Sequence, residues 1–334
     1  VLARVTGARL ILNERLLATL EAVHARRERP MPRREERLAL LPQGAVLWSV
    51  ERGEPGWLLE TERSAVVVLP AALPALADLL TRHLLPYAHE RLGREGVLVR
   101  TLKTAGLTPS EVEERIGPWL GAEGEVSVSC VPVDGEVWVR LSARAASLPP
   151  AEAALREVET PVAEVLGVDC YGRDQDTLES VVGRLLAERR LTLSVAESCT
   201  GGLLGHRVTN VSGSSTYFDR GVVTYSNQAK EELLGVPRAL LVAHGAVSAP
   251  VALAMARGIC RASNTPLGLA ITGIAGPEGG TAAKPVGTVF VGLAYPGGAE
   301  ARKFLFRGGR ESIKWQSAQM ALDLLRRWLL QEKR

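Results

Sequence analysis

The stretch "AESCTGGLLGHR", residues Ala196 to Arg207, decides how the sequence is interpreted. It begins at the end of an apolar run, "LTLSVA", which predicts a short buried strand, and it leads into a predicted helix. Ser198 lies where the strand ends, and Gly201 and Gly202 lie where the helix begins. Such a turn presents backbone N–H groups at the positive end of a helix. It therefore suits a phosphate, a carboxylate or a developing oxyanion.

A second glycine-rich loop, "TGIAGPEGGTAAKPVG" at residues 272–287, also follows a predicted strand. Neither loop matches the P-loop or the dinucleotide-binding fingerprint. Two glycine-rich loops, each at the exit of a strand, are typical of a ligand cleft at the edge of an α/β sheet. The sequence therefore predicts a binding cleft in its last part.

A serine needs a base before it can act as a nucleophile. His206 lies two helical turns past Ser198 and is expected to point away from it, and His244 has no acidic partner nearby in sequence. Lys230, which follows "VTYSNQA", is the better candidate, because a lysine buried among apolar groups loses its proton near neutral pH. Only six of the 40 basic residues are lysines, so a lysine in this position suggests a role that arginine cannot fill.

Two other interpretations of this stretch stay open on the residues alone. Cys199 is intrinsically more nucleophilic than Ser198, but no histidine partner can be placed beside it. Alternatively, Ser198 and Thr200 are simple helix N-caps with no catalytic role.

Composition narrows the class of protein. The 334 residues are 46% apolar, and the net charge of +3 does not indicate a strong nucleic-acid surface. No apolar run approaches the roughly 18 residues needed to span a membrane. The four cysteines are scattered and the five histidines show no metal-ligand spacing. We therefore expect a cytoplasmic protein without metal or cofactor.

The chain is predicted to contain three domains. Residues 1–95 are weakly patterned α/β, and residues 96–170 form a small α+β unit of three strands and two helices, the second of which is interrupted near Pro161. In residues 171–334, strands alternate with helices, which predicts a layered α/β domain containing a strand "GVVTYS". The sequence begins with Val1, so we expect the natural chain to start upstream.

Four motifs in order, "AESCTGG", "GVVTYSNQAKEELLGV", "HGAVSAPVALAMA" and "TGIAGPEGGTAAKPVGTVFV", closely resemble the C-terminal domain of the CinA (competence/damage-inducible) family. The resemblance implies hydrolysis of nicotinamide mononucleotide to nicotinic acid mononucleotide and ammonia, by a homodimer. It implies Ser198, Tyr225 and Lys230 as catalytic residues. It also implies Thr272, Gly273 and Gly276 as ligand contacts, to which we add Thr200, Gly201 and Gly202 from the first loop.

The chain departs from the family in several places. The family's Gly-Asp-Arg before the last helix is Gly308-Gly309-Arg310 here, so Arg310 remains a candidate phosphate contact. Residues 1–95 resemble part of a molybdopterin-binding-like domain linked to ADP-ribose hydrolysis. Their glycine-rich first half lies outside this sequence, so that activity is expected only if such a half exists upstream. Residues 96–170 resemble a KH-type domain without a GxxG loop, so nucleic-acid binding is not expected. A non-catalytic nucleotide-binding scaffold is the alternative to the amidohydrolase.

Overall fold

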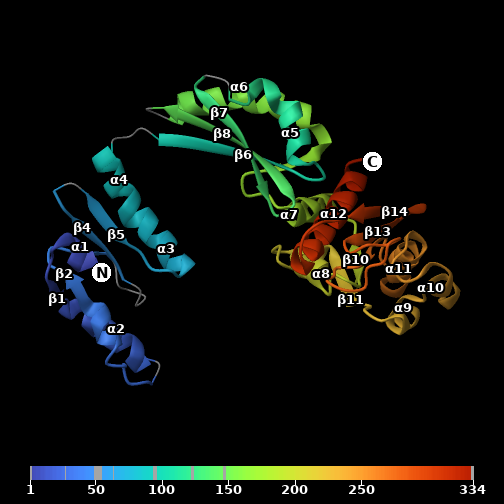
Figure 1. Cartoon of the computed structure of the whole chain (residues 1–334), viewed down its shortest axis with the longest axis horizontal. Helices are drawn as coiled ribbons and strands as arrows, with labels where there is room; N and C mark the ends of the chain where they lie inside the picture. The colour runs from blue at the N-terminus through green and yellow to red at the C-terminus, as the bar shows by residue number, and fades with distance from the viewer. Residues whose placement is uncertain are drawn as a thin grey trace. The chain divides into compact units, whose positions relative to one another are not determined.

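The chain folds into two units, residues 1–95 and 96–334, in a computed structural model (Figure 1). The structure describes residues 2–26, 28–48, 55–62, 64–92, 96–121, 124–145 and 148–331. The predicted division of the second unit into two domains stays a prediction.

The N-terminal unit is built from short elements around two separate small cores. One core contains Leu16 and Leu20 of α2, and the other joins Trp48 to Leu79 of α3. The antiparallel sheets are β1-β2 and β3-β4-β5. The elements are α1 (Leu2–Thr6), β1 (Leu10–Leu12), α2 (Glu14–Arg26), β2 (Leu40–Pro42), β3 (Val46–Trp48), β4 (Gly56–Glu60), β5 (Ala65–Val68), α3 (Leu73–Leu79) and α4 (Leu85–Leu92).

The second unit begins with a four-stranded antiparallel sheet in the order β7-β8-β6-β9. Alternate residues of its strands, such as Val137, Val139 and Leu141, pack against two helices. The elements are β6 (Gly96–Thr104), α5 (Pro109–Ile116), β7 (Val126–Val133), β8 (Glu136–Ala145), α6 (Leu148–Leu166) and β9 (Cys170–Arg173).

Two expectations for this region were wrong. Helix α6 runs through Pro161 without a break, because the helix buries Leu155, Val162 and Leu166 in the core on both sides of it. This burial outweighs the local cost of the proline. The sequence also predicted three strands, but β9 adds a fourth, which pairs with β6.

The rest of the second unit is a three-layer α/β structure, as predicted. Its sheet has the order β11-β10-β12-β13-β14, in which β11, β10 and β12 are parallel and the last two strands are antiparallel. One face packs on α7, α8 and α12, and the other packs on α9, α10 and α11. The strands are β10 (Leu193–Glu197), β11 (Phe218–Val223), β12 (Leu267–Gly273), β13 (Thr288–Tyr295) and β14 (Gly298–Leu305). The helices are α7 (Leu178–Arg189), α8 (Leu203–Thr209), α9 (Asn227–Leu234), α10 (Arg238–His244), α11 (Ala249–Ser263) and α12 (Arg310–Gln331).

The strand predicted at residues 221–226 begins and ends earlier than expected. Strand β11 ends at Val223, and Ser226 is already the N-cap of α9, because its hydroxyl accepts a hydrogen bond from the Ala229 N–H. Tyr225 therefore lies in the short connection between strand and helix and not on the strand itself.

Helix α12 joins the α/β layers to the four-stranded sheet through a buried charge network. Asp323 accepts hydrogen bonds from both Arg326 and Arg327, at distances down to 2.6 Å. Arg326 continues to the Val168 carbonyl oxygen at 2.7 Å, and Arg327 pairs with Asp169 at 2.6 Å. Asp323 and Arg326 are almost fully buried. The network therefore fixes α12 against the loop that leads into β9.

Replacing Asp323 tests this junction. Asp323→Asn leaves the buried Arg326 guanidinium without its charge partner, which typically costs about 3–5 kcal/mol. We expect a large fall in the denaturant midpoint of unfolding. Glu152→Gln is the matched control, because it removes one partner of an exposed pair with Arg156, where the effect is about 0–1 kcal/mol. Equal midpoints for the two variants would contradict a structural role for the network.

Candidate active site at the ends of the parallel strands

The candidate site is built from three loops that follow the parallel strands β10, β11 and β12. Main-chain hydrogen bonds hold these loops in register: the Ser198 N–H donates to the Ile271 carbonyl oxygen at 3.0 Å, and the Thr224 N–H donates to the Glu197 carbonyl oxygen at 2.8 Å. The carboxyl ends of parallel strands meet at one edge of a sheet, where α/β proteins bind ligands. The predicted loops therefore do converge.

Ser198 and Lys230 are in direct contact. Lys230 lies in the first turns of α9, and its side chain points back under the loop, where only 1% of it is exposed. Its Nζ lies 3.1 Å from the Ser198 Oγ, 2.7 Å from the Thr224 carbonyl oxygen and 3.4 Å from the Tyr225 carbonyl oxygen. Within the described residues, no carboxylate forms an ion pair with this amine.

Burial lowers the pKa of the Lys230 amine, because removing it from water penalises the charged form. A neutral amine has two N–H donors and one lone pair. The carbonyl oxygens of Thr224 and Tyr225 can accept from both donors, which leaves the lone pair for the Ser198 hydroxyl. The three oxygens would also match the three N–H donors of an ammonium, so it is the lowered pKa that favours an unprotonated amine able to accept a hydrogen bond from the serine.

Tyr225 contributes to the site differently from the other two predicted catalytic residues. Its main-chain oxygen contacts Lys230, whereas its phenol is 61% exposed and accepts a hydrogen bond from Arg310 at 3.0 Å. Arg310 is the first residue of α12 and also donates to the Gly276 carbonyl oxygen at 2.7 Å. Arg310 therefore connects the loop after β11 to the glycine-rich loop after β12.

The glycine-rich loop is fixed by two side chains, Lys284 and Thr272, of which the sequence analysis singled out only Thr272. Lys284 donates to the carbonyl oxygens of His244 and Val247, at 2.9 and 2.7 Å. The buried Thr272 hydroxyl donates to the Ala246 carbonyl oxygen at 2.8 Å. The scarcity of lysine was the signal that could have identified Lys284, since a compact ammonium suits two converging carbonyl oxygens.

Gly273 of this loop lies close to the neighbouring strand. A Cβ at that position would come within 2.6 Å of the Val289 side chain and 3.1 Å of the Cys199 sulfur. Gly276 has a φ of +78°, in the left-handed region that favours glycine. Both glycines thus shape the wall of the site through their missing side chains.

The loops enclose a cavity of about 270 Å³. Seven of the predicted site residues line it: Ser198, Tyr225, Lys230, Thr272, Gly273, Gly276 and Arg310. The remaining lining residues are Cys199, Ala246, Val247, Ile274, Ala275, Glu278 and Gly279. Thr200, Gly201 and Gly202 are not among the lining residues, and Thr200 is fully buried.

Glu197 explains why the start of α8 differs from the expectation. Its buried carboxylate accepts hydrogen bonds from the backbone N–H groups of Gly202, Leu204 and Gly205, at 2.8–3.1 Å. The sequence analysis expected the N–H groups at the start of α8 to bind a ligand anion. In the structure, the Glu197 carboxylate accepts hydrogen bonds from them instead. The sequence shows this acid directly before the serine and three residues before the Thr-Gly-Gly turn, but this spacing alone does not reveal that the acid caps the helix.

Other candidate nucleophiles and bases are less well placed. Burial raises the pKa of the Cys199 thiol to about 11, so little of it is thiolate at neutral pH. His206 is hydrogen-bonded to Asn210, the C-cap of its own helix, and His244 is not among the residues that line the cavity. In the described part of the chain, no group of three His, Cys, Asp or Glu residues is arranged to hold a metal ion.

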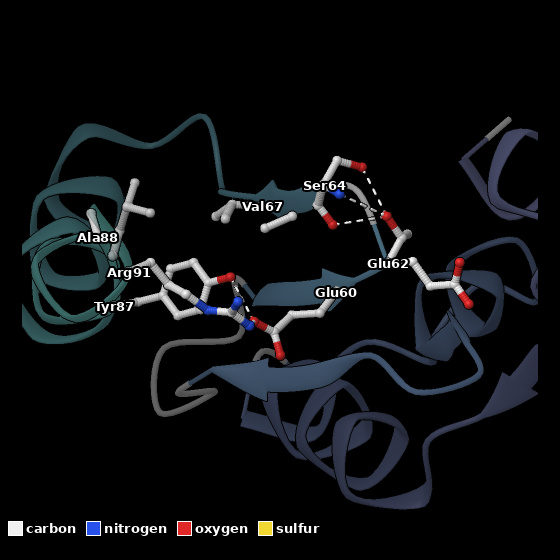
Figure 2. A pocket seen from close by; sticks show the side chains of 10 residues that line it. Glu60, Glu62, Ser64, Val67, Tyr87, Ala88 and Arg91 are labelled. Atoms are coloured by element: carbon white, nitrogen blue, oxygen red, sulfur yellow. Dashed lines mark hydrogen bonds and ion pairs between the residues drawn. The ribbon is translucent and has the colours of Figure 1, made fainter. Parts of the chain in front are cut away.

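A larger hollow, about 490 Å³, lies in the N-terminal unit between the β4–β5 hairpin and α4 (Figure 2). Glu60 at its edge is already engaged, because it accepts from the Tyr87 hydroxyl at 2.7 Å and pairs with Arg91. Thr61 and Ser64 are hydrogen-bonded to each other. This hollow is bigger than the site in the second unit, but most of its polar side chains are hydrogen-bonded or ion-paired to one another.

Sequence comparisons agree with this architecture. Residues 99–172 match the model of the damage-inducible protein CinA KH domain, and residues 175–329 match that of the CinA C-terminal domain. A competence-damage inducible protein of Moorella thermoacetica is 46% identical over 98% of this chain and 80% of its own length. The chain belongs to the CinA family.

Further CinA relatives match the chain over different lengths. A CinA-like protein of Geobacter sulfurreducens is 42% identical over 98% of this chain and 80% of its own length. A crystal structure of a CinA superfamily protein from Klebsiella pneumoniae covers 46% of this chain and 97% of that protein, with 35% identity and a TM-score of 0.45. Among the described residues, no helix is long and apolar enough to cross a membrane.

Proposed function

We propose that this CinA-family protein is an amidohydrolase that converts nicotinamide mononucleotide to nicotinic acid mononucleotide and ammonia. The observation that carries the proposal is the contact between the Ser198 hydroxyl and the buried, uncompensated Lys230 amine. The choice of substrate comes from the motifs shared with the family. The cavity supports it with one exposed guanidinium, Arg310, at the edge where a phosphate is expected.

In the proposed reaction, Lys230 accepts the proton of the Ser198 hydroxyl while Oγ attacks the carboxamide carbon. Lys230 then gives this proton to the departing nitrogen, and ammonia leaves an ester on Ser198. Water attacks the ester with Lys230 again as base, which releases the carboxylate product and restores the serine. Tyr225 and Arg310 form the edge of the cavity that holds the nucleotide in place.

The adjacent residues Ser198 and Cys199 provide a matched pair of variants. We expect Ser198→Ala to lower the rate of ammonia release by several orders of magnitude, because it removes the nucleophile. We expect Cys199→Ser to keep most of the activity, because its thiol is buried and protonated. Binding of nicotinamide mononucleotide to Ser198→Ala, measured by calorimetry, checks that the site is intact. The reverse pattern of activities would assign the nucleophile to Cys199.

Lys230→Arg tests the base. Arginine keeps the positive charge, but it cannot lose a proton near neutral pH, so we expect a fall of about 100- to 10,000-fold in kcat with ligand binding weakened only modestly. In the wild type, kcat should rise with pH as Lys230 deprotonates and reach a plateau above its lowered pKa. Lys303→Arg, at an exposed position on β14, is the matched control: the same substitution there should leave kcat unchanged.

Two further measurements make the Lys230 test decisive. An arginine fills more space than a lysine, so the Lys230→Arg protein could lose activity because it is less well folded. The melting temperature of this variant, and the activity of a second variant, Lys230→Gln, show whether the loss of rate reflects loss of fold. Normal turnover in a folded Lys230→Arg protein would exclude the amine as base. Binding without ammonia release in the wild type would favour the alternative, a nucleotide-binding scaffold.

The homodimer and the cytoplasmic location implied by the family resemblance belong to the same proposal. Sedimentation tests the homodimer, and cell fractionation tests the location.

A further inference from the structure

The buried Glu197 carboxylate limits where the phosphate of the substrate can bind. The Glu197 carboxylate already accepts three backbone N–H groups in the first turn of α8. A phosphate placed there would lose those donors and would meet a buried negative charge. The phosphate therefore needs cationic groups elsewhere around the cavity.

Two basic side chains on α12 flank the Ser198 loop. Arg310 is exposed and uses two of its five N–H donors, on the Gly276 carbonyl oxygen and the Tyr225 hydroxyl. Lys314 follows one helical turn later, on the same side of the helix. Its Nζ reaches the Ser198 loop, since a Cβ at Gly201 would lie 3.8 Å from it.

Lys314 differs from the other lysines near the site. Lys230 and Lys284 each donate to two main-chain carbonyl oxygens, whereas Lys314 makes no hydrogen bond or ion pair within the described residues. Glu278 lines the cavity and Glu311 lies beside Arg310 in sequence, but neither forms an ion pair with Arg310 or Lys314 in that part of the chain. The ammonium group of Lys314 is therefore uncompensated at its position.

We infer that Lys314, together with Arg310, binds the 5′-phosphate of the nucleotide outside the cavity, over Gly201. This inference rests on the proposed function for the identity of the ligand. The carboxamide then lies inward at Ser198, and the phosphate lies outward between a planar guanidinium and a compact ammonium, both of which suit phosphate oxygens. Lys314 contacts only the non-reacting end of the substrate, so its loss weakens binding without slowing the chemical step.

Binding to the Ser198→Ala protein tests the inference without requiring turnover. Calorimetry compares nicotinamide mononucleotide and ribose 5-phosphate, which both carry the phosphate, in variants with and without Lys314→Gln. We expect Kd to rise about tenfold for both ligands, as for loss of one charge-assisted contact. Lys303→Gln, an exposed lysine on β14, is the matched control and should leave both Kd values within twofold.

Activity measurements on the protein with intact Ser198 complete the test. Lys314→Gln should raise KM for nicotinamide mononucleotide about tenfold and keep kcat within twofold. Equal Kd values for Lys314→Gln and Lys303→Gln would overturn the phosphate site, even if ammonia release is normal. Absence of ammonia release, with the Lys314 effect on Kd preserved, would overturn the proposed reaction and leave the phosphate site standing. A fall in kcat at unchanged Kd would also overturn the assignment.

Discussion

The site depends on one buried amine that has no opposite charge beside it. Lys230 contacts two carbonyl oxygens and a hydroxyl, and its burial penalises the charged form, which lowers the pKa of the amine. Both carbonyl oxygens belong to the connection between β11 and α9. The early end of β11 and the Ser226 N-cap turn the chain at this place and thereby bring Lys230 against Ser198.

Helix α12 connects this chemistry to the rest of the second unit. Its first residue, Arg310, joins two of the three site loops, while Asp323 and Arg326 near its other end are buried against the loop before β9. The four-stranded sheet thus supports the helix that forms one edge of the site. This arrangement gives the KH-type region a structural role in the unit.

Sequence patterns predicted the helices and strands and the contact between Ser198 and Lys230. They did not predict which acceptor the backbone N–H groups at the start of α8 bind. Alternating strands and helices predicted the layered fold, and the rarity of lysine identified Lys230 correctly as the partner of Ser198. The sequence also offered the start of α8 to a ligand, which was wrong because Glu197 folds back onto it. Such a contact depends on tertiary geometry, and no local spacing distinguishes a capping acid from a solvated one. The continuity of α6 through Pro161 was missed for the same reason, since burial on both sides decides it.

The protonation state of Lys230 tests the account most directly. With only six lysines in the chain, [13Cε]-lysine labelling gives a spectrum in which the Lys230 signal is identified by its absence from Lys230→Arg. Following that signal against pH by NMR measures the pKa of the amine in the folded, unliganded protein. The account predicts a midpoint clearly below the value of about 10.4 for an exposed lysine. A midpoint at or above that value would mean that the amine is charged at neutral pH and cannot serve as the base for Ser198.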